Sequence, residues 1–166
     1  PEFLGLPGAE GWRHGVDAAR IAQRLRADTG HAIKAVCVVH NETSTGVASR
    51  IGEVRKAIDR AGHPALLLVD TISSLGSIDY RHDEWGVDVT VAGSQKGLML
   101  PPGLSFNAIS EKARAASRAM ARATMPDSRN APDDTTAAKT WALGAVTLGC
   151  RGLARANGAS GHHVAV

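Results

Sequence analysis

Apolar residues recur in two different periods along the first two thirds of the chain, and each period predicts one kind of element. Over residues 17–29 they return at helical spacing, with Asp17 in the N-cap position and Gly30 just beyond the end. Residues 50–61 repeat this pattern and are followed by Gly62. The spacing therefore predicts two amphipathic helices, each closed by a glycine.

Short apolar runs rich in β-branched residues separate these helices and predict strands. They read "IKAVCVVH" at 33–40, "ALLLVD" at 65–70 and "VDVTVAGS" at 87–94. A further strand is expected at 104–109, before an Ala- and Arg-rich helix at 111–124. The order strand, helix, strand, connection, strand is typical of a mainly parallel sheet with crossover helices. The sequence thus predicts an α/β fold.

Beyond residue 124 the periodicity is low, and Ala and Gly predominate. We found no internal repeat. The expected organisation is a leader over residues 1–16, which resembles a cloning remnant at its start, an α/β core over 17–118, and an Ala/Gly/Arg-rich tail over 119–166.

Composition narrows the functional classes. The 166 residues suffice for one domain, and with 4% aromatic residues its core must consist mainly of Ala, Val, Leu and Ile. The net charge of +3 comes from scattered arginines, which argues against a nucleic-acid binder. Cys37 and Cys150 match no metal or redox spacing, the pair His162-His163 lacks further ligands, and no metal site is expected. Without a membrane-length apolar run or a signal peptide, a cytoplasmic protein is expected.

Three polar clusters fall where the three predicted parallel strands end: "HNETSTG" at 40–46, "DTISS" at 70–74 and "SQKG" at 94–97. Ligands of parallel sheets bind outside the carboxyl ends of the strands. Asp70 and Lys96 lie in two of these clusters. They would form either a simple ion pair or a pyridoxal phosphate site, in which a lysine binds the cofactor and an aspartate bonds its ring nitrogen.

The amino-acid sequence around Asp70 and Lys96 is more specific evidence of function than the spacing of the two residues. "HNETSTG" and "LLLVDTISSLGSIDYRHDEWGVDVTVAGSQKGLMLPPGLSF" resemble the central part of the class V aminotransferases, most closely the serine–glyoxylate and alanine–glyoxylate branch. The resemblance is dense over residues 33–116. It implies part of a fold-type-I pyridoxal phosphate domain, a homo-oligomer, and amino transfer from serine or alanine to glyoxylate.

Carried over by residue, the resemblance makes Lys96 the Schiff-base lysine and general base, and Asp70 the partner of the pyridine nitrogen. It places Thr43 near the ring hydroxyl, Gln95 toward the phosphate and Ile72 on one face of the ring. Pyridoxal 5'-phosphate would be the cofactor, and a small amino acid and an oxo acid the substrates.

The resemblance covers less than half of a full-length family member. It does not include the glycine-rich phosphate turn, the aromatic residue that stacks on the ring, or the arginine that binds the substrate carboxylate. It also fades after about Ala119. From this we expect a truncated core that transfers amino groups weakly or not at all by itself, and that self-associates to cover its exposed faces.

Other interpretations stay open at this stage. Thr43 and Ser44 are also residues that cap a following helix. A repurposed α/β scaffold acting as a small hydrolase has the right residue types at strand ends but no "GxSxG" elbow; they are Ser44, Ser73, Ser74, His40, His82 and Asp70. An oligomeric binding or structural module is a third interpretation. Replacement of Lys96 distinguishes the aminotransferase interpretation, in which activity would be lost, from the hydrolase interpretation, in which it would be unchanged.

Overall fold

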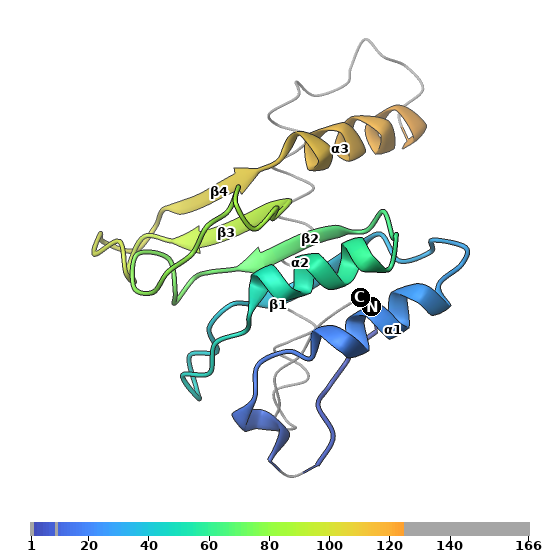
Figure 1. The fold of residues 1–166 in the computed structure, drawn as a ribbon. Helices are drawn as coiled ribbons and strands as arrows, with labels where there is room; N and C mark the ends of the chain where they lie inside the picture. Colours follow the sequence, from blue (N-terminus) through green and yellow to red (C-terminus); the bar gives the residue numbers. More distant parts are fainter. Residues whose placement is uncertain (1, 9, 125–166) are drawn as a thin grey trace.

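A computed structural model describes residues 2–8 and 10–124, and the expected tail lies almost wholly outside them. Each helix and strand expected over residues 17–124 is present (Figure 1); α3 has the expected bounds, and the ends of the others differ from the prediction by at most a few residues. The elements are η1 (Gly11–Arg13), α1 (Ala18–Ala27), β1 (Ala35–Val39), α2 (Ile51–Arg60), β2 (Leu66–Asp70), β3 (Val89–Gly93), β4 (Ser105–Ile109) and α3 (Glu111–Thr124).

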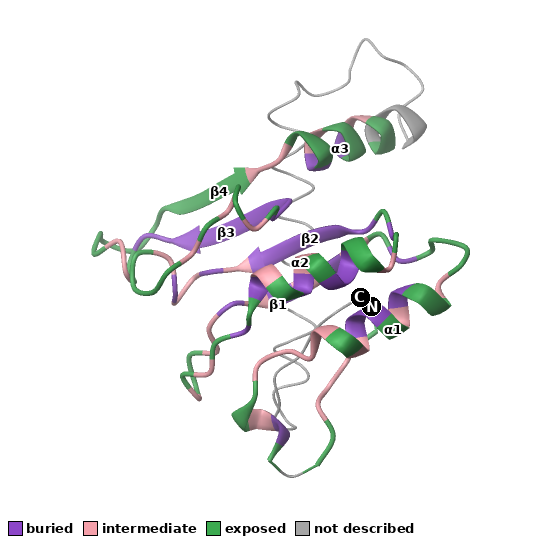
Figure 2. Ribbon diagram, viewed as in Figure 1, coloured by how far each residue is buried: buried purple, intermediate pink, exposed green. Residues whose placement is uncertain are grey.

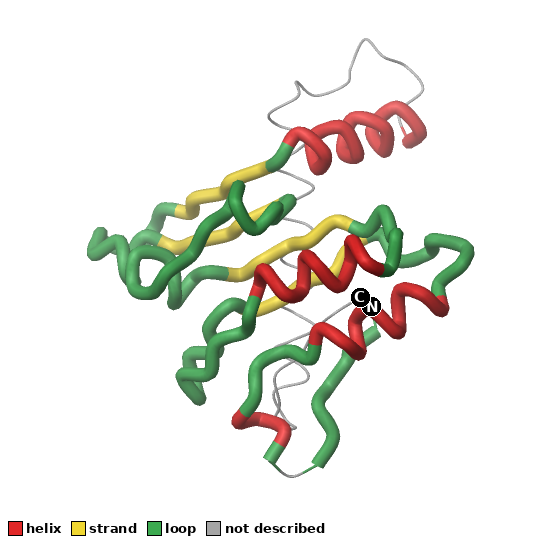
Figure 3. Tube along the Cα trace, viewed as in Figure 1, coloured by secondary structure: helices red, strands yellow, loops and turns green. Residues whose placement is uncertain are grey.

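The four strands form one sheet in the order β1-β2-β3-β4. β1, β2 and β3 are parallel, and β4 returns antiparallel to β3. The predicted mainly parallel sheet is therefore confirmed. Because the first three strands run the same way, their carboxyl ends meet at one edge, where Figure 3 shows the loops gathering.

Burial differs across the sheet and explains the sequence patterns. β2 is apolar and buried on both faces, whereas β1 alternates between buried and half-buried positions. One face of the sheet packs against α1 and α2. β4 is exposed along almost its whole length (Figure 2). The larger part of the core therefore lies under α1 and the crossover helix α2, and a smaller cluster joins β2 and β3 to Ala113 of α3.

Local interactions fix the ends of the helices. Asp17 is the N-cap of α1, as expected, and its Oδ1 accepts a hydrogen bond from the Ala19 amide at 2.8 Å. Gly62 follows α2 with a φ of 63°, a left-handed conformation that favours glycine. These two features confirm the expected start of α1 and the expected end of α2. α1 itself ends at Ala27 with Asp28 as its C-cap, so Gly30 does not close it as expected.

The buried carboxylate of Asp88, just before β3, ties α3 to the sheet. Its Oδ2 accepts from the Leu67 amide at 2.9 Å, and the Ser110 hydroxyl donates to its Oδ1 at 2.9 Å. Lys112 of α3 lies 3.7 Å from the same carboxylate. Asp88 therefore organises the end of the sheet opposite to the carboxyl ends of the parallel strands.

Within residues 2–8 and 10–124, every helix is too short or too polar to span a bilayer. In that part of the chain, no group of three or more His, Cys, Asp or Glu side chains is arranged to hold a metal ion.

Candidate functional site

Three segments meet at the carboxyl edge of the parallel strands, and together they carry all five residues expected in the site. The hairpin 40–49 contains Thr43, the turn 70–78 contains Asp70 and Ile72, and the loop 94–104 contains Gln95 and Lys96.

Asp70 is the last residue of β2 and lies between Val39 of β1 and Val91 of β3 in the sheet register. Its Oδ1 accepts a hydrogen bond from the Ile72 amide at 2.8 Å. Burial raises the pKa of the Asp70 carboxyl, the Ile72 amide opposes this, and the negative charge of Glu42 raises it further. A cationic group close to Asp70 would relieve both unfavourable effects.

Ile72 and Gln95 come together over Gly93, the last residue of β3. A Cβ placed on Gly93 would lie 3.3 Å from Gln95 Oε1 and 3.6 Å from Ile72 Cδ1. Glycine at this position therefore lets a side chain from the turn and one from the lysine loop lie over the same strand end. Two of the five expected site residues are brought together in this way.

The loop that carries Lys96 is closed by Ser94, which is buried. Ser94 Oγ donates to the Pro101 carbonyl at 2.6 Å and accepts from the Leu104 amide at 3.3 Å. Within the loop, the Met99 amide donates to the Lys96 carbonyl at 2.9 Å. Lys96 is exposed at the start of a loop whose two ends are thus held together.

Replacement of Ser94 by alanine is expected to loosen this loop. The change removes both side-chain hydrogen bonds of Ser94, and we expect a destabilisation of about 1–3 kcal/mol. Urea denaturation measures the loss, and limited proteolysis within 95–103 should become faster. Ser105→Ala, on the exposed strand β4, is the matched control. Equal stability of the two variants would contradict this role for Ser94.

Gly97 places the lysine loop directly on the preceding turn. A Cβ on Gly97 would lie 2.3 Å from the Leu75 carbonyl oxygen and 2.4 Å from Ser77 Oγ. Gly76, between these two residues, has a φ of 79°. Only a residue without a side chain permits this approach of two backbones, and Lys96 is therefore held beside the turn that begins at Asp70.

Thr43 is exposed near the tip of the hairpin 40–49. The hairpin is held by the Glu42 amide, which donates to the Val47 carbonyl at 3.0 Å. The Ser44 hydroxyl donates to Glu42 Oε1 at 2.8 Å, and the N-cap of α2 is Arg50, which has no side-chain cap. The interpretation of Thr43 and Ser44 as helix caps is therefore wrong, because the second arm of the hairpin, residues 45–49, lies between them and α2.

The hydrolase interpretation finds one serine–histidine pair. His40 Nδ1 and Ser74 Oγ lie 3.0 Å apart, but His40 is 4% exposed and Ser74 1% exposed, so a substrate cannot reach the hydroxyl. Ser73 exchanges hydrogen bonds with Asn41 instead. His82 Nδ1 lies 2.7 Å from Thr90 Oγ1. The structure forms no accessible triad from these residues.

Burial lowers the pKa of both His40 and His82. The negative charge of Asp79 opposes this effect at His40, and the charges of Asp83 and Asp88 oppose it at His82. Burial thus favours the neutral imidazole in each case.

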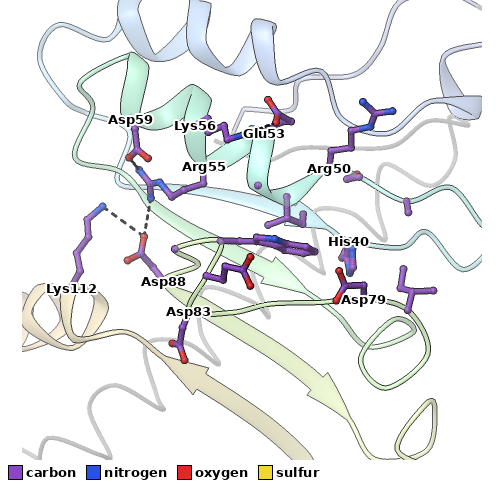
Figure 4. A pocket seen from close by; sticks show the side chains of 18 residues that line it. His40, Arg50, Glu53, Arg55, Lys56, Asp59, Asp79, Asp83, Asp88 and Lys112 are labelled. Carbon is purple, nitrogen blue, oxygen red and sulfur yellow. Dashed lines mark hydrogen bonds and ion pairs between the residues drawn. The ribbon is translucent and has the colours of Figure 1, made fainter.

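An open groove of about 1100 Å³ lies between α2 and the segment 78–88 (Figure 4). It is lined by charged side chains, several of them paired with one another. Arg55 contacts Asp59 at 2.6 Å and Asp88 at 3.4 Å, for example. None of the five expected site residues lines it, whereas His40 does. The groove therefore adjoins the carboxyl-edge site without including its five expected residues, and it shares with that site the hairpin residues His40, Ala48 and Ser49.

Comparison with known proteins identifies what this arrangement resembles. The family model of class V aminotransferases matches residues 16–147. Serine–glyoxylate aminotransferase of Methylorubrum extorquens is 62% identical over 104 residues, which are 63% of this chain and 26% of the relative. L-aspartate–glyoxylate aminotransferase of Paracoccus denitrificans is 59% identical over 61% of this chain and 26% of the relative. The chain thus spans about a quarter of the length of these relatives.

Solved structures agree on the fold. Ureidoglycine–glyoxylate aminotransferase of Bacillus subtilis superposes with a TM-score of 0.58 and 29% identity, covering 70% of this chain and 28% of that one. Pyridoxamine–pyruvate aminotransferase of Mesorhizobium loti gives 0.55 and 31%, covering 62% and 25%. The sheet is therefore part of a fold-type-I pyridoxal phosphate transferase fold. The family match continues past residue 119, and the expected boundary there stays a prediction.

Proposed function

This chain belongs to the class V aminotransferase family, and on that premise we propose that its carboxyl-edge site binds pyridoxal 5'-phosphate, with Lys96 as the covalent anchor. The observation that carries the proposal is the meeting of the turn that begins at Asp70 with the lysine loop, fixed by the contact of Gly97 with Leu75 and Ser77. A strand-end carboxylate and an exposed amine are thereby held on adjoining segments.

The residues present fit this cofactor. The partly buried Asp70 carboxylate has a raised pKa, and a protonated ring nitrogen is the kind of cationic partner that compensates such a group. The amine of Lys96 is exposed and available to react. Gly93 leaves room for Ile72 and Gln95 to lie over the strand end, one apolar and one polar. These side chains together therefore suit a flat, charged, heteroaromatic ligand.

The bound cofactor would supply an electron sink for the bonds around the substrate's amino carbon. Asp70 would keep the proton on the ring nitrogen, and Ile72 would pack on one ring face. Thr43 would bond the ring hydroxyl, while Gln95 would reach toward the phosphate. Lys96 Nζ would bind the cofactor covalently and later carry a proton to or from the substrate carbon.

For the whole protein we propose an oxo acid as acceptor and a small amino acid as donor. Glyoxylate is the acceptor in the names of both the Methylorubrum and the Paracoccus relatives, which supports glyoxylate. Their named donors differ, serine in one and L-aspartate in the other, at nearly equal identity to this chain. Serine or alanine remains our proposal for the donor. We propose that the choice between amino donors is made mainly by residues outside the quarter of the full-length relatives that this chain matches.

Self-association is the second part of this proposal. Apolar side chains stand exposed on and after the lysine loop, with Met99 90% and Leu104 60% exposed, and they continue to Phe106 on β4. An exposed apolar surface of this kind is typical of contacts between proteins. We expect sedimentation equilibrium to give a mass of at least two chains. A monomer at all concentrations would contradict the oligomer without affecting the cofactor site.

The function is tested by titrating the chain with pyridoxal 5'-phosphate and following absorbance. We expect Asp70→Asn to bind it about ten- to a hundredfold more weakly, because a charge-assisted hydrogen bond is lost. Wild-type affinity should also fall on acidification, since protonation of the Asp70 carboxyl removes the same charge, and the asparagine variant should lack that part of the pH dependence. Asp59→Asn, on the exposed side of α2, is the control. Equal affinity of the Asp70 and Asp59 variants would contradict the assignment.

A further inference from the structure

His40 follows β1 directly and joins the sheet to the turn that carries Asp70. Its amide donates to the Asp70 carbonyl at 2.9 Å, which extends the strand pairing by one residue. Its Nδ1 lies 3.0 Å from Ser74 Oγ, and both side chains are buried. Since both side chains are almost fully buried, the two groups satisfy each other's hydrogen-bonding capacity.

Two aromatic rings pack against the imidazole. The ring centroids of Tyr80 and Trp85 lie 5.2 Å and 5.9 Å from that of His40, and the two are 5.5 Å from each other. His40 also lines the end of the groove in Figure 4, beside Asp79. The imidazole is thus confined among rings, and Nδ1 is kept toward Ser74.

Ser74 lies within the turn that supports the lysine loop. Its amide donates to the Thr71 carbonyl at 3.1 Å, and its carbonyl accepts from the Ile78 amide at 3.0 Å. The next three residues, 75–77, make the close approach to Gly97. A displacement of Ser74 would therefore move the backbone on which Gly97, and with it Lys96, rests.

We propose that His40 is a positioning residue for Lys96, acting through its hydrogen bond to Ser74 and the packing of residues 75–77 on Gly97. The role assigned to Lys96 rests on the proposed function. The mechanical part, that the His40–Ser74 bond fixes the lysine loop, concerns the protein alone.

His63 provides a matched comparison at the other end of the sheet. It is buried like His40, its Nε2 lies 3.2 Å from Asp28 Oδ2, and its Nδ1 accepts from the Ala65 amide at 3.1 Å. His63 precedes β2, whereas His40 follows β1, so the two lie at opposite ends of the parallel strands. If loss of a buried histidine acted only through general destabilisation, replacing His63 would affect the lysine loop as much as replacing His40.

The first test is hydrogen exchange on the full chain without cofactor. In His40→Leu, the Met99 amide, which bonds the Lys96 carbonyl, should exchange about tenfold faster than in the wild type. Ser74→Ala removes the same hydrogen bond with a smaller change in volume and should give the same increase. In His40→Asn, whose amide reaches the position of Nδ1, protection should return to within about threefold of the wild type. In His63→Leu, Met99 should keep its protection.

The second test is the affinity for pyridoxal 5'-phosphate of the same variants. His40→Leu and Ser74→Ala should each weaken binding about tenfold, and the double variant no further, because the two residues act through one bond. Unchanged Met99 exchange and unchanged affinity in folded His40→Leu and Ser74→Ala proteins would overturn the proposal. If the wild type fails to bind the cofactor at Lys96 but the exchange result holds, the proposed function falls and the positioning role of His40 stands.

Discussion

In a Lys96→Arg variant, covalent attachment of pyridoxal 5'-phosphate at the carboxyl edge of the sheet is expected to disappear. Arginine keeps the positive charge and most of the length of lysine, but its guanidinium stays protonated and cannot attack the cofactor's aldehyde. Borohydride reduction followed by intact-mass measurement should show one cofactor per wild-type chain and none specifically bound to the variant.

Lys112→Arg is the control for reactive lysines in general. Lys112 is exposed, donates to the Ala65 carbonyl at 3.1 Å and lies 3.7 Å from Asp88, at the end of the sheet opposite to the strand-end clusters. The Lys112 variant should take up as much cofactor as the wild type. If the Lys96 variant also kept one equivalent, Lys96 would not be the anchor.

Gly97→Ala is expected to be the most damaging small substitution at the site. The added Cβ would lie 2.3 Å from the Leu75 carbonyl oxygen, which is backbone and cannot swing aside like a flexible side chain. The turn or the lysine loop must move, and we expect a loss of about 3 kcal/mol in the free energy of unfolding. Because Lys96 is the adjacent residue, the affinity for the cofactor should fall as well.

Gly30→Ala is the matched control for Gly97→Ala. A Cβ on Gly30 meets nothing within 4 Å, and the loop that contains it lies near the opposite end of the strands. We expect the Gly30 variant to unfold at the wild-type urea concentration, within error. Equal urea midpoints for the two alanine variants would mean that the contact between Gly97 and the turn is not tight in solution.

The sequence was sufficient to predict the elements and the edge of the sheet that carries the site. Strands such as "LLLVD" are buried on both faces, so they appear as continuous apolar runs. The polar clusters at Asp70 and Lys96 follow such runs, and parallel strands bring their carboxyl ends together. For this reason the five expected site residues lie on three adjacent segments in the structure, although their roles toward a cofactor remain proposals.

The supports of the site could not be predicted in the same way, because they depend on distances between segments. Nothing local marks Ser94 as the residue that closes the lysine loop, or Gly97 as a glycine required by backbone contact. By residue type His40 and Ser74 suit a hydrolytic site, and only the structure shows that both are buried and bonded to each other. Residue type alone suggests Thr43 and Ser44 as helix caps, because the second arm of their hairpin, which separates them from α2, leaves no clear sequence pattern.

Whether Lys96 anchors the cofactor is measured directly by locating pyridoxal 5'-phosphate on the wild-type chain. The protein would be incubated with pyridoxal 5'-phosphate, reduced with borohydride, digested and mapped by mass spectrometry. A single saturable adduct on Lys96 is expected. Adducts spread over Lys34, Lys56, Lys112 and Lys139, or no adduct at all, would contradict a formed cofactor site at the carboxyl edge of the sheet.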